Sequence, residues 1–468
     1  MIINEKNNKF WYETNNTIKI SQSKLIKFLE TKGFARVKLA DNNHENVRLN
    51  NNRMKIVSRE EISDFLKHFL LNIANREDVF EVFAKGIGQY INDQKLALLN
   101  KIELIDDRDP KDKATFYFKN VFCEISASGI TVKKYDELKN AIWENRIIKR
   151  SFNLPQNPDQ SQFKNFCKLI SKNDRDRFNS LKSILGYLLH RNKSNSGKAI
   201  VLYDENMGLN GKANGGTGKT LLGQAIGKCR EVEAFDGKNL KTGSWFNNQR
   251  VNLTTEILFY DDFTKEVSFE IFYPLITTGI EVEKKRQQAF FITYERSPKV
   301  LISSNYLVRG LGGASEARRK FEFELANYFT DKHTPEDEFG NRFFDDWDSE
   351  QWNSFYFFMM ENVQFYLANG LVEAEPINLN RAALIADTNT TFIEFAKHYV
   401  QTDTWIDKRE HHGLFKENFS QDISSHIFTK HLKAYADHFG HSYEDKSTGG
   451  DYKYIIHTNK SNDGEKLQ

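Results

Sequence analysis

Residues 215–220, with the sequence GGTGKT, combine the side chains and the backbone freedom that bind a polyphosphate. Glycine lets backbone N–H groups approach phosphate oxygens closely, and the N-terminus of a following helix adds the positive end of its dipole. In such a loop, Lys219 reaches the β- and γ-phosphates and Thr220 places its hydroxyl on Mg²⁺. We therefore predict a site for ATP and Mg²⁺, whose other loop residues are Gly215, Gly216, Thr217 and Gly218.

Elements on both sides of this loop support the interpretation. An apolar run over residues 199–203 predicts a strand that enters the loop, and an amphipathic helix is expected after it. The strict pattern GxxxxGK[ST] is broken, because Ala213 stands where its first glycine belongs, and the connection from the strand is long. The alternative is an ordinary glycine-rich surface turn, but the flanking strand and helix favour a phosphate-binding loop.

A second apolar run, residues 257–260, ends in two acids, Asp261 and Asp262. In a phosphate-loop domain the first acid holds Mg²⁺ through water, and the second orients and deprotonates the attacking water. By itself the pattern favours a strand that ends in a solvated acidic turn. Paired with the phosphate loop, it predicts nucleotide hydrolysis.

Two further features extend the same series. A third strand, expected over residues 299–302, is followed by Asn305, whose amide could sense the γ-phosphate or hold the attacking water. Arg318 and Arg319 come next, and in a ring such an arginine could reach the nucleotide of the neighbouring subunit. The alternatives are a common turn asparagine and a solvated basic helix turn.

Between the second and third strands, the sequence predicts a β-hairpin with basic residues near one end. These residues are Lys284, Lys285 and Arg286. Basic side chains on a projecting hairpin suit phosphate contacts to a single nucleic-acid strand. A solvated charged turn explains them equally well.

The order of these motifs, from Lys219 to Arg319, resembles that of superfamily III helicases, the AAA+-type helicases of viruses, phages and plasmids. The stretches SILGYLLHR and TTGIEVEKKR…PKVLISSN look like the helicase part of phage and plasmid primase-helicases of the poxvirus type. The resemblance is strong over residues 180–330 and weaker in the flanks.

The resemblance implies a homo-hexameric ring ATPase that moves on single-stranded DNA and unwinds duplex DNA during phage or mobile-element replication. It also implies that Lys284 or Lys285 contacts DNA, that Asn305 is the sensor, and that Arg318 or Arg319 is the finger. The alternative function is a nucleotide-regulated replication initiator or defence-type switch without unwinding activity. A small-molecule kinase fits less well, because it leaves the hairpin and Asn305 unexplained.

The flanking regions lack recognisable catalytic sites. Asp107 and Asp109 are the only acidic pair that would suit a primase, but no histidine follows before His190, so a separate primase or polymerase is an expected partner. Near the C-terminus, a helix followed by a strand hairpin resembles a winged helix, whose role would be either that of a plain capping domain or DNA binding.

The predicted fold is α/β: a P-loop AAA+-like ATPase domain between an α+β N-terminal domain and a small helical, winged-helix-like C-terminal domain. Helices are expected over residues 21–33 and 135–148, a capping box at Ser58 and Glu61, and strand–turn–strand over 115–135. Residues 153–162 are the best linker candidate. The expected units are 1–152 (N-terminal accessory), 163–196 (helical), 197–330 (ATPase), 331–375 (helical lid) and 380–468 (C-terminal).

The composition sets limits on the class of protein. The 468 residues include 66 Lys and Arg against 64 Asp and Glu, a net charge of +2, which excludes a histone-like polybasic protein. Three cysteines far apart in sequence exclude a CxxC zinc site and a disulfide framework. The sequence contains neither a signal-peptide pattern nor an apolar run of membrane-spanning length, so we expect a cytoplasmic protein, in a bacterial host if phage-derived, with no membrane contact.

Overall fold

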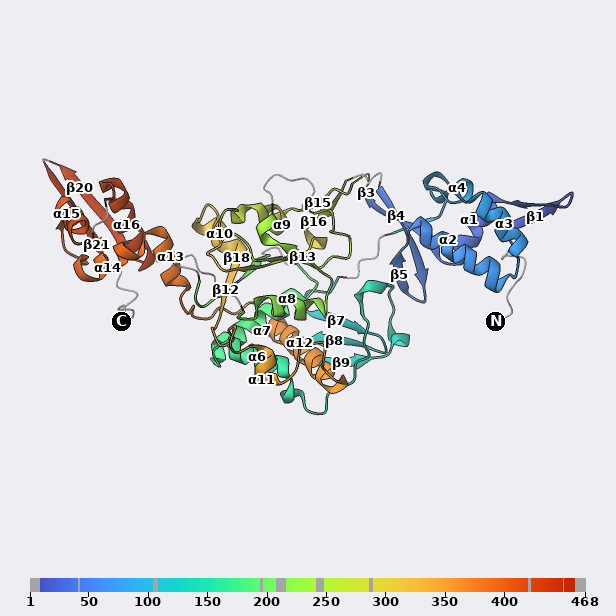
Figure 1. The fold of residues 1–468 in the computed structure, drawn as a ribbon, viewed down its shortest axis with the longest axis horizontal. Helices are drawn as coiled ribbons and strands as arrows, with labels where there is room; N and C mark the ends of the chain where they lie inside the picture. The colour runs from blue at the N-terminus through green and yellow to red at the C-terminus, as the bar shows by residue number, and fades with distance from the viewer. Residues whose placement is uncertain are drawn as a thin grey trace.

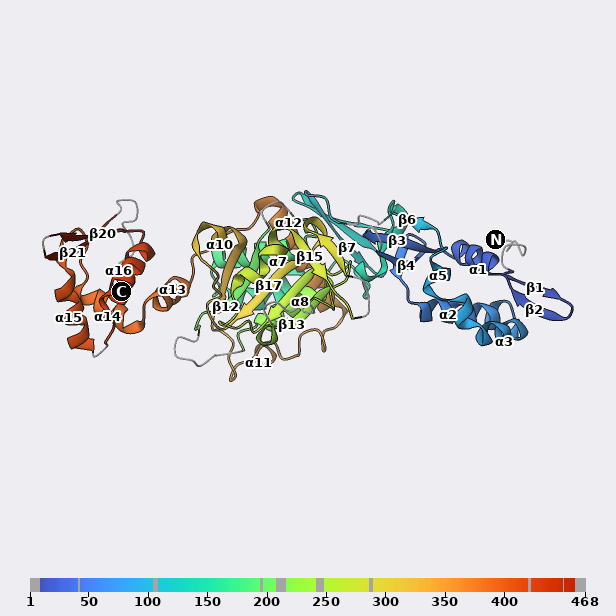
Figure 2. The same cartoon turned by 90° about the horizontal axis from the view of Figure 1, so that it is seen from above.

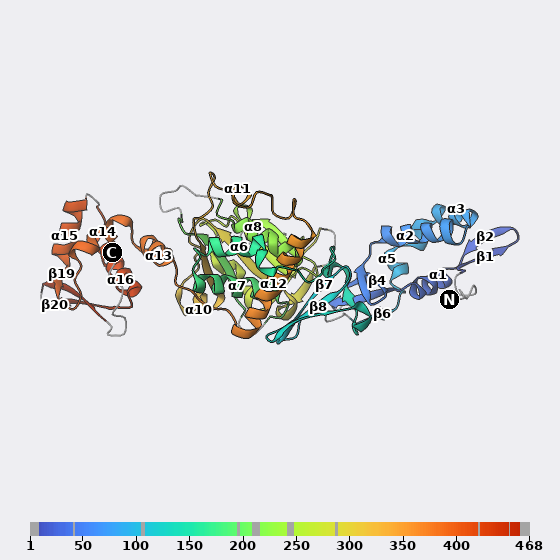
Figure 3. The same ribbon diagram turned by 90° about the horizontal axis from the view of Figure 1, so that it is seen from below.

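The computed structural model describes residues 9–40, 43–103, 108–193, 197–207, 216–240, 248–285, 289–419, 422–448 and 450–458. The chain is elongated, with an N-terminal unit and a C-terminal unit at opposite ends of a larger central unit (Figure 1). Figures 2 and 3 show the same order of units from two further directions. Among the described residues, no helix has both the length and the apolar character needed to cross a membrane.

The central unit is built on a five-stranded, all-parallel sheet, which confirms the expected α/β class. Its strands are continuous apolar runs because both faces of a parallel sheet are covered. In spatial order the strands are β13 (Val232–Asp236), β14 (Ile257–Asp261), β17 (Lys299–Ser304), β12 (Ala199–Asp204) and β18 (Lys320–Leu325).

The two faces of the sheet bury two different cores, as alternate residues of β12 show. Ile200 and Leu202 belong to the core between the sheet and its helices, whereas Val201 and Tyr203 belong to the core on the opposite face of the sheet. Figure 1 shows the helices below the sheet and the hairpin above it. The helices below are α6 (Gln162–Ile170), α7 (Arg175–Leu189), α8 (Lys219–Gly227) and α12 (Ser349–Asn369); above lie α9 (Tyr273–Thr277), β15 (Gly279–Val282) and β16 (Phe290–Thr293).

Helix α12 is part of the main core, although residues 331–375 were expected to form a lid. It packs along α7 so closely that a Cβ at Gly186 would lie 2.1 Å from the Asn362 carbonyl oxygen. The segment expected to be a linker is also held against α12, because the Asn153 N–H donates to Asn353 Oδ1 at 3.1 Å and the Gln156 N–H to Glu350 Oε1 at 2.7 Å.

A second sheet extends the central unit toward the N-terminal unit. Instead of strand–turn–strand, residues 113–133 form three antiparallel strands, and the expected boundary near residue 152 does not separate two cores. Phe118, for example, stacks on Phe152 and meets the ring of Tyr356 in α12 edge-on. The strands of this sheet are β11 (Ile147–Ile148), β7 (Lys113–Phe118), β8 (Phe122–Ser126) and β9 (Gly129–Lys133).

The helix expected over residues 135–148 is wrong. The segment instead contributes one short strand to each of two sheets: β10 (Ile142–Trp143) pairs with the N-terminal unit, and β11 pairs with β7. One 3₁₀ turn, Tyr135–Glu137, precedes both strands, and a second, Glu144–Arg146, separates them. Strand pairing and the burial of Ile142 and Trp143 outweigh helix propensity here. We call residues 142–148 the connecting segment.

The N-terminal unit has its own core of aromatic and aliphatic side chains. The helix expected over residues 21–33 is confirmed, and so is the capping box, in which Ser58 and Glu61 bond reciprocally. Its elements are β1 (Trp11–Thr14), β2 (Thr17–Ile20), α1 (Gln22–Thr31), β3 (Phe34–Ala40), β4 (Asn43–Asn50), β5 (Arg53–Ile56), α2 (Arg59–His68), α3 (Glu77–Lys85), α4 (Ile87–Tyr90), α5 (Asp93–Leu96) and β6 (Lys101–Ile102).

The C-terminal unit is a small α+β body around a separate core that includes Phe395, Phe415 and Phe428. The expected helix followed by a strand hairpin is present, and the helix stops before Gly440, whose φ is +65°. Its elements are α13 (Leu379–Asp387), α14 (Thr390–Tyr399), β19 (Ile406–Asp407), α15 (Lys408–Phe419), α16 (Ser425–His438), β20 (Ser442–Thr448) and β21 (Asp451–His457).

Candidate nucleotide-binding site

Polar side chains meet where three neighbouring strands of the parallel sheet end. β12, β14 and β17 lie side by side, and because they are parallel their carboxyl ends share one edge. The strand that follows β12 in sequence, β13, lies at the far edge of the sheet. Connections that leave a sheet in opposite directions open a crevice at the carboxyl ends, which is where α/β proteins place their ligands.

The end of the glycine-rich loop has the backbone that only glycine adopts easily. Gly216 and Gly218 have φ values of +101° and +108°, and Gly218 is the N-cap of α8. A Cβ on Gly218 would lie 2.5 Å from Cζ of Phe166, so the helix N-terminus packs directly on an aromatic ring of α6. Gly215 and Ala213 lie outside the described residues.

Lys219 is held between the ends of two strands. Its Nζ donates to Asn305 Oδ1 at 2.8 Å and forms an ion pair with Asp204 Oδ1 at 2.5 Å. Asp204 is the last residue of β12, is 1% exposed, and also accepts a hydrogen bond from the Thr217 hydroxyl. Its second oxygen is buried with no hydrogen-bond partner among the described residues. Asp204 thus belongs to the site, and the sequence patterns did not indicate it.

Thr220 and Asp261 bring two oxygen donors together. The Thr220 hydroxyl donates to Asp261 Oδ2 at 2.9 Å, and the Ser303 hydroxyl donates to the other carboxylate oxygen. A hydroxyl and a carboxylate are hard oxygen ligands of the kind Mg²⁺ prefers, and Mg²⁺ sites typically use one or two protein oxygens plus waters and phosphates. The donor set therefore fits Mg²⁺.

Asp262 lies beside this pair in an unusual backbone conformation. Its φ of +56° is rare outside glycine and costs on the order of 1–3 kcal/mol, a strain typical of functional sites. Its carboxylate is 2.9 Å from Lys238 Nζ and accepts from Asn305 Nδ2 at 3.4 Å. The side chain is 45% exposed, so a water molecule can reach it.

Lys219, Thr220, Asp262 and Asn305 line a cavity of about 610 Å³, and Asp204 and Asp261 are bound to Lys219 and Thr220 in this lining. One wall is the loop and the start of α8, and the opposite wall comes from the region of α11 (Pro335–Phe339). The sequence patterns did not indicate this second wall. Its contributing side chains are Thr334, Pro335, Glu336, Arg342 and Phe343.

The two predicted arginines lie at the amino ends of the parallel strands, opposite the end that carries the nucleotide site. They end α10 (Gly313–Arg319), directly before β18, whose first residue pairs with Ala199 at the start of β12. Arg319 is half-buried, donates to the Ser315 carbonyl at 2.8 Å, and stacks 4.7 Å above the ring of Tyr273. Arg318 is exposed.

The predicted hairpin forms as β15 and β16, away from the nucleotide edge and beside the N-terminal sheet. Lys284 is half-buried, with its Nζ 5.7 Å above the ring of Phe290, and Lys285 is exposed. Arg286 lies outside the described residues. The structure therefore gathers residues 216–220, 261–262 and 305 into one site and places the basic hairpin elsewhere.

No protein-family model and no curated protein matches the chain. Solved structures of the NrS-1 C-terminal region do. An apo structure of its residues 305–718 is 12% identical, covers 92% of this chain and 98% of its own, and has a TM-score of 0.42. An A-form apo structure of the region is 15% identical with the same coverages and a TM-score of 0.44. Because similarity this low shows no more than a loose likeness, the chemistry of this chain is inferred from its own residues.

Proposed function

We propose that the protein is a Mg²⁺-dependent ATPase of the P-loop, AAA+-like kind and that it acts as a DNA helicase in phage or mobile-element replication. One observation carries the ATPase part. Lys219 and Thr220, at the start of α8, line one cavity together with Asp262 and Asn305 from the carboxyl ends of two parallel strands, and Asp261 accepts a hydrogen bond from Thr220 beside them. The motif order that resembles superfamily III helicases supports the helicase part.

The geometry suggests a role for each group. The Lys219 ammonium moves from Asp204 toward the β- and γ-phosphates as ATP enters the cavity. Thr220 and Asp261 would hold Mg²⁺, Asp261 through water, and the ion would supply positive charge beside the phosphates. Asp262 takes a proton from the attacking water, which the Asn305 amide helps to orient.

The position of the arginine pair supports a ring of subunits. At about 3.3 Å per residue, the six residues of β12 separate Arg318 from the loop of its own chain by roughly 20 Å. Arg318 can therefore act on transition-state charge only at the nucleotide of a neighbouring copy. Being exposed, it is the better finger of the two, since Arg319 is bound within its own chain. We propose a homo-hexamer as the assembly.

The ATPase is tested with Lys219→Ala. ATP hydrolysis should vanish, because the variant loses the cation that binds the phosphates. Lys27→Ala, on the exposed face of α1 in the N-terminal unit, is the control and should hydrolyse ATP normally. Normal hydrolysis by Lys219→Ala would overturn the proposal.

The helicase activity requires a second measurement, because an ATP-dependent switch could pass the first. Wild-type protein should displace an annealed oligonucleotide from a DNA strand in an ATP-dependent manner, and Lys219→Ala should not. ATP hydrolysis without any strand displacement would instead support an initiator or switch.

A further inference from the structure

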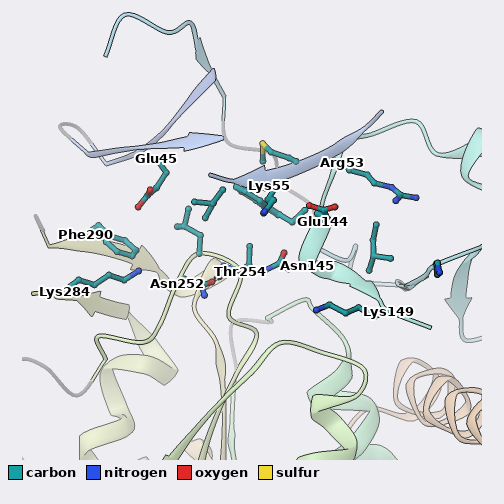
Figure 4. A pocket seen from close by; sticks show the side chains of 16 residues that line it. Glu45, Arg53, Lys55, Glu144, Asn145, Lys149, Asn252, Thr254, Lys284 and Phe290 are labelled. Carbon is teal, nitrogen blue, oxygen red and sulfur yellow. Dashed lines mark hydrogen bonds between the residues drawn. The ribbon is translucent and has the colours of Figure 1, made fainter. Parts of the chain in front are cut away.

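A groove separates the N-terminal sheet from the central unit. It has a volume of about 990 Å³, larger than the nucleotide cavity. Figure 4 shows its two sides: strands of the N-terminal unit, with Glu45, Lys55 and Arg53, face Phe290, Lys284 and the turn at Thr254. None of the roles proposed for the nucleotide site uses this groove.

The groove is basic. Its lining includes five cationic side chains and two acids, Glu45 and Glu144. Lys119 and Lys149 are exposed, whereas Lys55 is engaged by Glu61 on α2. Figure 4 shows the four labelled cations, Lys284, Lys55, Arg53 and Lys149, spread across the groove without converging on one point. The five cationic side chains of the lining are Arg53, Lys55, Lys119, Lys149 and Lys284.

The connecting segment fixes the two sides of the groove relative to each other. Its residues 142–143 pair with β5 of the N-terminal sheet, and its residues 147–148 pair with β7 of the central unit. Between these strands, Asn145 Nδ2 donates to the Thr254 hydroxyl at 2.5 Å and Arg146 Nη1 to the Thr254 carbonyl at 2.7 Å. The groove is therefore a built feature of the fold.

The basic track continues past the groove. A second cavity of about 610 Å³ shares Asn145, Ile147 and Lys149 with it and adds further cations, among them Arg150 and Lys228 on the surface. An extended row of cations matches the regularly spaced charges of a phosphodiester backbone, whereas a small anion would require convergent donors. Buried Phe290 and Trp143 contribute apolar surface to the lining of the groove.

We propose that this groove binds the backbone of single-stranded DNA and leads the strand along the N-terminal unit to the hairpin lysine, Lys284. The proposal rests on the proposed function in that DNA is the ligand, but it does not require ATP hydrolysis. It adds the N-terminal sheet and the connecting segment to the DNA-binding surface, for which the sequence patterns indicated the hairpin and left the C-terminal unit open.

The test uses the full chain with Lys119→Ala and Lys149→Ala combined, and oligo-dT as the probe. Affinity is measured by fluorescence anisotropy over a range of salt concentrations. Each phosphate contact with a single strand contributes about 0.7 to the slope of log K against log salt, so the double variant should lose about 1.4. Its hydrolysis of ATP without DNA should equal that of the wild type.

Two controls separate charge from fold. Lys24→Ala combined with Lys27→Ala, on the exposed face of α1, removes the same charge elsewhere and should leave the slope unchanged. Lys119→Arg combined with Lys149→Arg should restore binding. If the alanine variant keeps the wild-type slope of log K against log salt, the groove does not bind DNA, even if Lys219→Ala abolishes ATPase activity. A loss of slope in a protein that never hydrolyses ATP would support the groove and reject the proposed function.

Discussion

The Lys219 ammonium forms an ion pair with the buried carboxylate of Asp204. This ion pair must break before the ammonium can bind phosphates. Asp204 is 1% exposed, and its remaining hydrogen-bond donor would be the Thr217 hydroxyl. A negative charge a few ångströms from bound phosphates repels them by a few kcal/mol in a partly buried site. Asp204 thus positions Lys219 at the expense of nucleotide affinity.

Asp204→Asn should therefore bind ATP more tightly. Asparagine keeps the shape and can still accept from Thr217, but it removes the repelling charge. We expect the Kd for a fluorescent ATP analogue to fall about tenfold, or ~1.4 kcal/mol. Glu205→Gln, at the next position of the chain, is the control and should leave the Kd unchanged. Weaker binding by Asp204→Asn would show that its charge is needed to position Lys219.

Gly218 supports a second prediction, because both its backbone and its surroundings exclude a side chain. Gly218→Ala places a Cβ 2.5 Å from the Phe166 ring at a φ of +108°, so the loop must shift and ATP binding should be lost. Gly227→Ala, in the same helix, meets nothing closer than 3.9 Å and should bind ATP normally. Equal ATP affinity in the two variants, measured by titration, would contradict this account.

At the scale of elements, the amino edge of the parallel sheet is joined to its surroundings by buried charges. Asp109, 2% exposed, accepts from Arg191 Nη2 at 2.8 Å and from the Thr115 N–H at 3.1 Å. Burial tends to raise the pKa of Asp109, but the charges of Arg191, Arg230 and His190 outweigh it and hold the pKa below 3.8. This carboxylate ties the start of β7 to the end of α7.

Asp109→Asn should destabilise the central unit in a pH-dependent way. Removing one partner of a buried ion pair costs about 3–5 kcal/mol at neutral pH. Because the folded-state pKa is depressed, this contribution is complete above the ordinary value of 3.8 and is lost as the pH falls through the lower folded value. The variant should unfold at a lower urea concentration than the wild type. This difference between the two unfolding midpoints should be large at neutral pH and small in acid. Asp112→Asn, an exposed neighbour, should show no such difference at either pH. A difference that stays constant in acid would contradict the role of the Asp109 charge.

At the scale of the whole molecule, one chain cannot complete the proposed reaction. The loop and Arg318 lie at opposite edges of one sheet, so the finger of one copy must serve the site of the next. The N-terminal and C-terminal units lie at the two ends of the long axis, outside the sheet that carries both features (Figure 1).

This arrangement predicts complementation between two inactive variants. Arg318→Ala should lower ATP hydrolysis by a factor of about 10³ or more, the usual contribution of an arginine finger, while ATP still binds. Mixed with Lys219→Ala, it should regain part of the activity, because one interface then pairs an intact loop with an intact Arg318. Arg319→Ala is the matched comparison and should remain more active. A mixture that stays inactive would show that the finger does not act between subunits.

Local elements and local chemistry could be predicted from the amino-acid sequence alone. The strands at 199–203, 257–260 and 299–302, the helix after the glycine-rich loop and the hairpin are all where the patterns predict them, because apolar runs and turn residues act over short distances. The residues for phosphate, metal and water chemistry were identifiable for the same reason, since their types and order are local features.

The contacts between those elements could not be predicted in this way and follow from the folded structure. The tertiary structure places Asp204 against Lys219, brings side chains from residues 334–343 to the nucleotide cavity, and places Arg318 at the opposite edge of the sheet. It also divides residues 142–148 between two sheets, where a helix had been expected, and so forms the basic groove. These outcomes depend on contacts between residues far apart in the chain, and such contacts leave no periodic pattern along the sequence.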